Sequence, residues 1–328
     1  MTTPIRVAVT GAAGSICYSL LFRIAAGELF GPDQPVILQL VEIPPAMKAL
    51  EGTVMEINDC AFGTLAGIEM ADNPTDGFKG TNVAILVGGR PRGPGMVRAD
   101  LIKMNGPIFE AQGKALNASA ADDIRVVVVA NPCNTNALIT RSNAPDIPNE
   151  RFTAMTRLDQ NRTAFQLANK AGVSVNDVSK ITIFGNHSNT MYPDIYNATI
   201  KGKPVTEVIT DDAWLKGDFI KTIQSRGKAI IEARGKSSAA SAGNAALEHV
   251  RDWFSVTPED TWVNMAVNSD GSYGVEKGLI YSFPVRCDGK GNYEIVQGLE
   301  INAFAQEKMN LTQAQLLEEK GHVADLID

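Results

Sequence analysis

The chain has 328 residues, of which 44% are hydrophobic, and a formal net charge of −7 at pH 7. This length favours two domains over one, and the hydrophobic content is that of an ordinary globular protein. The negative charge and the absence of a lysine/arginine block argue against nucleic-acid binding. No apolar run in the sequence approaches the roughly 20 residues of a membrane span, so we expect no membrane association. The first predicted strand begins at Ile5, and we therefore expect no secretory leader.

The four cysteines are scattered along the chain and form neither a Cys-x-x-Cys motif nor a cluster with metal-ligand spacing. They are Cys17, Cys60, Cys133 and Cys287. We expect reduced thiols in a reducing compartment, a cytoplasmic location, and no metal site.

The first half alternates apolar strands with amphipathic helices. Strands are predicted over Ile5–Thr10, Val36–Val41, Val83–Gly88 and Val126–Ala130, and helices over Ser15–Ala26, Ala46–Asp59 and Asp100–Ser119. Nearly continuous Val/Ile/Leu runs are typical of strands buried on both faces of a parallel sheet. The alternation predicts an α/β domain with a doubly wound parallel sheet over residues 1–155.

The pattern changes near residue 155. Longer helices are predicted over Leu158–Ala171, Ala213–Ala233, Ser237–Trp253 and Ile301–Leu326, and strands over Thr261–Val267, Leu279–Cys287 and Tyr293–Val296. Turn sequences separate these strands, as in hairpins. The second half therefore predicts an α+β domain over residues 156–328.

The first strand ends in Thr10-Gly11-Ala12-Ala13-Gly14. Gly11 permits a sharp turn into the following helix, and Gly14 allows a pyrophosphate to approach the backbone at the positive helix end. The second strand ends at Glu42, whose carboxylate can accept both ribose hydroxyls of adenosine and would repel a 2′-phosphate. This combination predicts a Rossmann-type domain that binds NAD in preference to NADP.

Polar residues follow the later strands of the first half. Arginines lie among glycines and prolines in Gly88–Arg98, a composition typical of a mobile loop that closes over an anionic substrate. Asn131 follows strand Val126–Ala130, where α/β folds place their ligands.

A candidate acid/base lies near the middle of the chain. His187, one of three histidines, follows the apolar run Ile181–Phe184 in the motif Gly-Asn-His-Ser, and histidine exchanges protons near pH 7. Asp159 and Arg162 are spaced i,i+3 on a predicted helix and point the same way. Asp159 can hold the Nδ1 proton of His187, and Arg162 can bind a carboxylate bidentately.

Three other candidates are weaker. His249 and His322 lack comparable neighbours and are predicted to be structural or surface residues. Tyr273 and Lys277 match the Tyr-x-x-x-Lys of short-chain dehydrogenases, which requires one helical turn between them. Here glycines surround the pair between two predicted strands, which favours a hairpin loop instead.

The motifs together resemble the NAD-dependent, cytosolic-type branch of the lactate/malate dehydrogenase family over essentially the whole chain. The resemblance rests on Thr10–Gly14, Asn131–Thr135, Leu158–Arg162 and Gly185–Ser188, which occur in the family's order. It implies His187 as the acid/base and Asp159 as its orienting partner. It also implies that Arg162 binds the carboxylate next to the reacting carbon. Arg92 and Arg98 are implied to bind the distal carboxylate and polarise the carbonyl. Asn131 is implied to bind substrate and nicotinamide ribose. The implied cofactor-binding residues are Gly11, Ala12, Ala13, Gly14, Ser15, Ile16, Cys17, Glu42, Asn105, Gln112, Val129, Asn131 and Ser241.

The resemblance further implies reversible oxidation of (S)-malate to oxaloacetate with NAD, in the tricarboxylic acid cycle, by a homodimer. Arg92 favours a dicarboxylate because lactate dehydrogenases carry glutamine there. Two alternatives remain: another NAD-dependent 2-hydroxy acid dehydrogenase, such as a lactate-like one, and an NAD-binding module without catalysis. Cys17 stands where the family commonly has a third glycine, and we expect this thiol to make the cofactor site sensitive to thiol reagents.

Overall fold

The computed structural model describes residues 2–91 and 96–327. Its contacts divide the chain into two compact units. Unit 1 comprises residues 1–153, 239–251 and 319–328, and unit 2 comprises residues 154–238 and 252–318. The chain therefore returns to unit 1 twice after residue 155.

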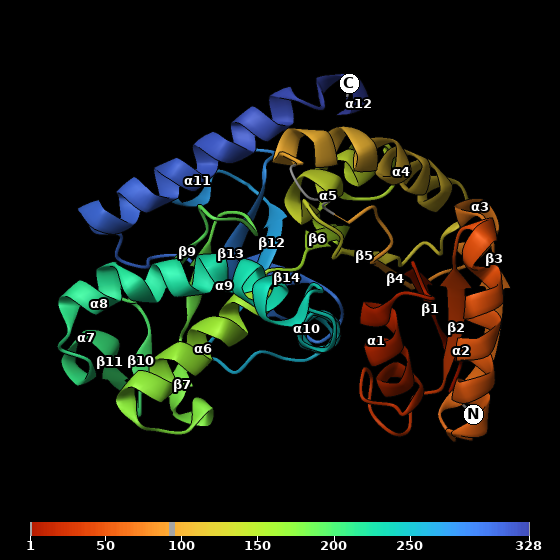
Figure 1. The fold of residues 1–328 in the computed structure, drawn as a ribbon, viewed down its shortest axis with the longest axis horizontal. Coiled ribbons are helices and arrows are strands. Elements are labelled where there is room, and N and C mark those ends of the chain that lie inside the picture. Colours follow the sequence, from red (N-terminus) through yellow and green to blue (C-terminus); the bar gives the residue numbers. More distant parts are fainter. Residues whose placement is uncertain (1, 92–95, 328) are drawn as a thin grey trace. The chain divides into compact units, whose positions relative to one another are not determined.

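Unit 1 is built on a parallel sheet in the order β3-β2-β1-β4-β5. Its strands are β1 (Ile5–Thr10), β2 (Val36–Val41), β3 (Leu65–Ala71), β4 (Val83–Leu86), β5 (Arg125–Val128) and β6 (Phe152–Ala154). Its helices are α1 (Ser15–Ala25), α2 (Met47–Asp59), α3 (Pro74–Gly77), α4 (Arg98–Ser119), α5 (Cys133–Ser142), α10 (Ala240–Trp253) and α12 (Ala324–Ile327). Figure 1 shows α1 and α2 beside β1 and β2, the arrangement of a Rossmann-type domain.

The register of this sheet aligns the carboxyl ends of its strands. Thr10 of β1 pairs with Val41 of β2 and with Leu86 of β4, and Leu86 pairs with Val128 of β5. Central strand residues such as Val9 and Ile85 are fully buried, as the continuous apolar runs predicted. The segments that follow these four strands therefore emerge along one edge of the sheet.

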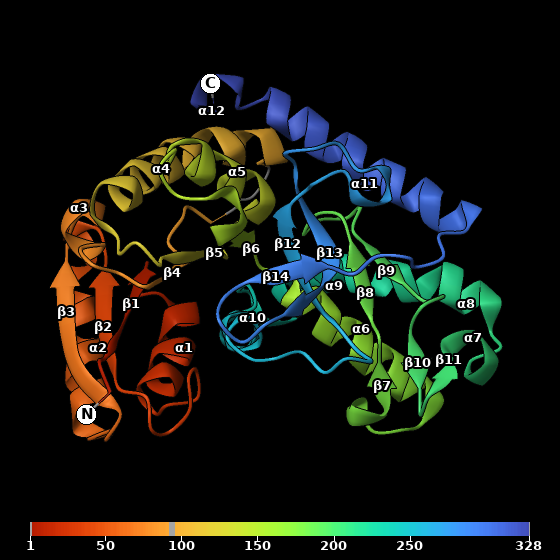
Figure 2. The same cartoon turned by 180° about the vertical axis from the view of Figure 1, so that it is seen from behind.

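Unit 2 combines antiparallel strands with helices of different lengths. Its strands are β7 (Val178–Ser179), β8 (Thr182–Phe184), β9 (Tyr192–Asp194), β10 (Thr199–Ile200), β11 (Lys203–Pro204), β12 (Val263–Asn268), β13 (Ile280–Cys287) and β14 (Tyr293–Ile295). Its helices are α6 (Arg157–Ala171), α7 (Val205–Val208), α8 (Asp212–Lys216), α9 (Asp218–Arg234) and most of α11 (Ala303–Gly321). Figure 2 shows β12, β13 and β14 side by side, and all pair antiparallel, which confirms the α+β prediction.

Aromatic side chains fill the core of unit 2. Phe184, Tyr192, Phe219, Tyr281 and Phe283 are almost completely buried in one cluster. This cluster packs β8, β9 and β13 against α9, so the strand that precedes His187 belongs to the rigid interior.

Several predicted boundaries were wrong for identifiable reasons. The helix predicted over Ala213–Ala233 is divided at Gly217, which has non-helical dihedral angles. The last predicted helix ends at Gly321, and the short helix α12 follows. The edge strand β3 was not predicted because Gly67 and Glu69 interrupt its apolar run and it is only partly buried.

The three weaker candidates lie where the sequence predicted. Tyr273 lies in the short 3₁₀ turn Ser272–Gly274 between β12 and β13, and its hydroxyl donates to the Val296 carbonyl, which confirms a loop rather than a helical Tyr/Lys pair. His249 is buried with its Nε2 2.9 Å from the Thr153 hydroxyl, and His322 is exposed. Both histidines are structural or surface residues, as predicted.

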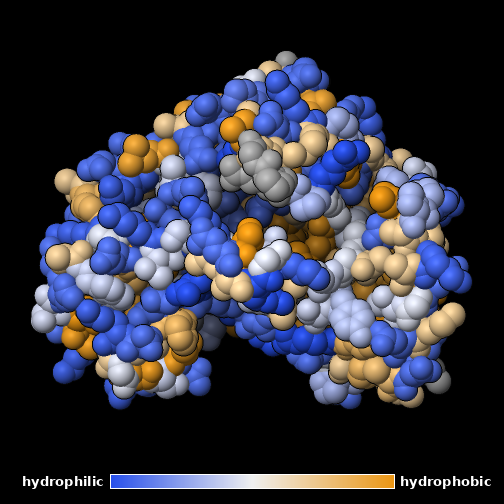
Figure 3. Space-filling model, in the orientation of Figure 1, coloured by the Kyte–Doolittle hydropathy of each residue, from blue (hydrophilic) through white to orange (hydrophobic). Residues whose placement is uncertain are grey.

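The face shown in Figure 3 is largely hydrophilic, with hydrophobic residues in small groups among the polar ones. Within the part of the chain that the structure describes, no helix combines the length and apolarity needed to cross a bilayer.

Candidate active site

The glycine turn of unit 1 is a close contact between two backbones. A Cβ atom on Gly11, which has φ +67°, would lie 2.6 Å from the Cα of Gly88 at the end of the β4 segment. Gly14 is the N-cap of α1 and offers no side-chain cap to the first turn. The turn therefore brings an uncapped helix N-terminus to the carboxyl edge of the sheet, where backbone N–H groups attract a phosphate.

Glu42 lies against this turn. One carboxylate oxygen accepts the N–H of Ala13 at 3.0 Å, and the other accepts the N–H of Ile43 at 2.9 Å. The acidic group predicted from the sequence is thus next to the glycines, although it comes from the end of a different strand.

Cys17 corrects an expectation. Its side chain is fully buried in α1, and its thiol donates to the Thr10 carbonyl, with the sulfur 3.6 Å from the oxygen. Burial, with a smaller contribution from Glu42, raises the pKa of this thiol far above its ordinary value. Because thiol reagents attack the exposed thiolate, this burial argues against the predicted sensitivity of the cofactor site through Cys17.

The helix after β4 is tied to the strand end at Asn131. Asn105 of α4 is fully buried, and its amide donates to the Asn131 carbonyl at 2.9 Å while its oxygen accepts the N–H of Arg90 at 2.8 Å. Asn131 itself is exposed at the edge of the sheet, and Val129 before it is buried. These contacts fix the beginning of the arginine-containing loop beside the predicted substrate asparagine.

The structure describes only one of the two arginines predicted on this loop. Arg92 lies outside the described residues. Arg98 is the first residue of α4 rather than part of the loop, and its guanidinium pairs with Glu319.

Two further predicted cofactor residues of unit 1 lie on α4 and α10, and Ser15 and Ile16 begin α1. Gln112 of α4 is buried, and its side-chain oxygen has no hydrogen-bond partner among the described residues. Ser241 is exposed in the first turn of α10. A Cβ on the nearby Gly243 would lie 3.0 Å from the Ile16 carbonyl, so the start of α10 packs against the start of α1. Residues distant in sequence thus meet beside the glycine turn.

Unit 2 holds the predicted acid/base pair. His187 Nδ1 lies 2.5 Å from an Asp159 carboxylate oxygen, and Asp159 is almost completely buried in the first turn of α6. A carboxylate can only accept, so Nδ1 carries the proton, and proton exchange with a substrate falls to Nε2.

Arg162 completes this group. Its guanidinium lies 3.7 Å from the other oxygen of Asp159, and its side chain is only 13% exposed. Burial lowers the pKa of Arg162, Asp159 opposes this shift and the nearby Arg226 adds to it. A mostly buried cation that shares its carboxylate with a histidine is suited to a second, external anion.

Buried contacts that the sequence did not reveal hold the acid/base pair in place. Asn264 of β12 donates to Gln160 of α6 at 2.9 Å and to the Ile181 carbonyl at 2.8 Å, which ties the helix of Asp159 to the strand of His187. Gly185 has φ +99°, and a Cβ there would lie 2.1 Å from the Thr312 hydroxyl oxygen. The backbone N–H of Asn186 donates to that hydroxyl at 3.1 Å. No local sequence signal marks Asn264 or Thr312, because their role depends on packing between distant segments.

Two family models match this chain. The model of the lactate/malate dehydrogenase NAD-binding domain matches residues 5–153, and that of the lactate/malate dehydrogenase α/β C-terminal domain matches residues 156–327. The chain belongs to the lactate/malate dehydrogenase family. It is accordingly an NAD-dependent oxidoreductase.

Solved structures include relatives of both specificities. A malate dehydrogenase from Naegleria fowleri is 51% identical, with a TM-score of 0.96 and 99% of each chain covered. A Trichomonas vaginalis lactate dehydrogenase, in complex with NADH and oxamate, is 39% identical, with a TM-score of 0.93 and coverage of 98% of this chain and 99% of that one. A malate dehydrogenase from Salinibacter ruber, 22% identical with a TM-score of 0.81 over 98% of each chain, shares the fold.

The residues of unit 1 fit the NAD expected of this family. The Gly11–Gly88 contact leaves no side chain at the turn, and Gly14 leaves the first turn of α1 uncapped, as a diphosphate requires. Glu42, directly after β2, has the carboxylate that would accept the ribose hydroxyls.

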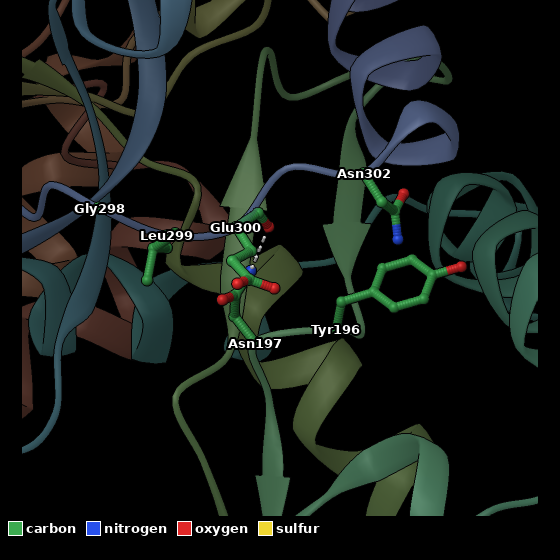
Figure 4. Close-up of a pocket in the computed structure, with 6 residues that line it drawn as sticks. All are labelled: Tyr196, Asn197, Gly298, Leu299, Glu300 and Asn302. Carbon is green, nitrogen blue, oxygen red and sulfur yellow. Dashed lines mark hydrogen bonds between the residues drawn. The ribbon is translucent and has the colours of Figure 1, made fainter.

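A cavity of about 340 Å³ in unit 2 has a different character. Figure 4 shows Tyr196, Asn197, Leu299, Glu300 and Asn302 around it, with the Asn197 amide donating to the Glu300 carbonyl at 3.3 Å. Its lining contains a carboxylate and no cation, so it does not suit an anionic substrate. Elsewhere in the described residues, no group of three or more His, Cys, Asp or Glu is arranged to hold a metal ion.

Proposed function

We propose that this protein is a malate dehydrogenase, which catalyses the reversible NAD-dependent oxidation of (S)-malate to oxaloacetate. The observation that carries the chemistry is the buried His187–Asp159 pair with Arg162 beside it. This arrangement supplies a proton donor and a carboxylate-binding cation, which an NAD-binding module without catalysis does not need. The 51% identity to the Naegleria fowleri malate dehydrogenase supports the choice of substrate.

The residues have the following roles in this proposal. The bound cofactor supplies or accepts the hydride. His187 donates its Nε2 proton to the carbonyl oxygen of oxaloacetate, and Asp159 stabilises the imidazolium before transfer. Arg162 binds the carboxylate next to the reacting carbon, and Asn131 orients the substrate. In the direction of malate oxidation, neutral His187 takes the hydroxyl proton.

Substrate choice depends on Arg92 and Arg98. A guanidinium at position 92 pairs with the second carboxylate of oxaloacetate, whereas the methyl group of pyruvate would leave it desolvated and unpaired. We expect discrimination of roughly a thousandfold from one such contact. The 39% identity to a lactate dehydrogenase makes a lactate-like specificity the second candidate.

The decisive experiment measures NADH oxidation with oxaloacetate and with pyruvate for wild type and Arg92→Gln. Turnover with oxaloacetate alone, strongly reduced in the variant, is the expected result. Preference for pyruvate in the wild type would establish the lactate-like alternative, and turnover of neither would exclude both substrates.

We also infer that the enzyme acts in the cytoplasm as a homodimer and serves the malate–oxaloacetate step of the tricarboxylic acid cycle. These statements rest on the family resemblance and on four cysteines that form no disulfide within the described residues. Light scattering on the purified protein tests the dimer directly, and a monomer mass would refute it.

A further inference from the structure

Arg98 forms an ion pair with the buried side-chain carboxylate of Glu319, near the end of α11. Its Nε donates to Glu319 at 2.5 Å, and its Nη2 donates to the other oxygen of the same carboxylate at 3.3 Å. The Glu319 side chain is 4% exposed, whereas that of Arg98 is 28% exposed. A third group, the hydroxyl of Thr135 in α5, also donates to Glu319.

The burial of Glu319 makes this pair hard to separate. A carboxylate removed from water needs a cation or several donors, and breaking a buried pair leaves the remaining charge uncompensated. If Arg98 moved away with a loop, the buried carboxylate would lose the cation that donates two of its hydrogen bonds. The arrangement therefore favours an arginine that stays fixed at the start of α4.

The pairing leaves part of the guanidinium available. An arginine side chain has five N–H donors, and Glu319 engages the edge formed by Nε and Nη2. Among the residues that the structure describes, none accepts a hydrogen bond from Nη1 of Arg98. A second anion or a carbonyl oxygen can bind at that nitrogen without displacing Glu319.

The partners of Glu319 lie next to the predicted substrate asparagine. Thr135 is in the first turn of α5, shortly after Asn131, and Asn105 of α4 donates to the Asn131 carbonyl. Glu319 thus joins the first turns of α4 and α5, and Asn105 links α4 to Asn131, which precedes α5.

We propose that Glu319 is a positioning residue that fixes the Arg98 guanidinium and presents its Nη1 donors to the substrate. The inference rests on the proposed function, since it assigns Arg98 to oxaloacetate binding. In the opposite case, Glu319 would compete with the substrate: its carboxylate would occupy the place of a substrate carboxylate on Arg98 and would have to be displaced before substrate binds.

The test compares Glu319→Gln with Glu318→Gln, which makes the same charge change at the neighbouring exposed position. We expect Glu319→Gln to raise the KM for oxaloacetate at least tenfold, with the dissociation constant of NADH within twofold of wild type. Glu318→Gln should leave both values unchanged. An unchanged KM in Glu319→Gln, or a lower one as expected for a displaced competitor, would overturn the proposal.

A double-mutant cycle separates positioning from a general structural role. In an Arg98→Gln background, Glu319→Gln should cause little further loss of kcat/KM, because both changes remove the same interaction. Additive losses would refute the assignment.

If thermal melting shows that Glu319→Gln does not fold, Thr135→Val replaces it. We expect Thr135→Val to raise the KM for oxaloacetate a few-fold, and an unchanged KM would refute the proposal. Wild-type protein that does not turn over oxaloacetate would refute the proposed function instead.

Discussion

Replacing Asp159 by asparagine tests the central interaction of the acid/base pair. The change keeps the shape of the side chain but removes the charge that lies 2.5 Å from His187 Nδ1. With an effective dielectric constant of about 20 and charge centres about 4 Å apart, the lost attraction is about 4 kcal/mol. Since roughly 1.4 kcal/mol corresponds to a factor of ten, kcat/KM for oxaloacetate reduction should fall about a thousandfold.

The assay follows NADH oxidation with oxaloacetate under steady-state conditions, with NADH binding measured by fluorescence quenching. Asp252→Asn is a matched control, because it removes the ion pair of Asp252 with Arg157 on the same helix α6. The control should lose stability while kcat/KM stays within a few-fold of wild type. A folded Asp159→Asn enzyme within tenfold of wild-type kcat/KM would refute the reasoning.

Two further predictions concern a glycine and a thiol. Gly185→Ala places a Cβ against Thr312 at positive φ and should cost about 3 kcal/mol of unfolding free energy. Gly172→Ala carries the backbone strain alone, because its Cβ would meet nothing within 4 Å; equal losses by chemical denaturation would disprove a Thr312 contribution. Iodoacetamide at neutral pH should label the exposed Cys60 and spare the buried Cys17, whose pKa burial raises. Mass spectrometry that finds Cys17 modified first would contradict this ordering.

Local sequence determined much of the fold because buried parallel strands have a distinctive composition. β1 and β2 were predicted with the bounds that the structure has, since Ile5–Thr10 and Val36–Val41 are nearly continuous apolar runs. The edge strand β3 could not be predicted in this way, because it is only partly buried and a glycine and a glutamate interrupt its apolar residues. Burial is a tertiary property, and composition reveals it only where a strand is covered on both faces.

The candidate site shows the same division. Residue types at strand ends and helical spacing are local features, and they identified the glycine turn, Glu42, His187, Asp159 and Arg162 as candidates. Only the tertiary structure decided three other features: the distance between His187 and Asp159, the burial of Cys17, and the ion pair of Arg98 with Glu319. These depend on packing between segments far apart in the chain, such as Glu319 against Thr135. One sequence records which groups are present, but the environment that fixes or buries each group forms only when the chain folds.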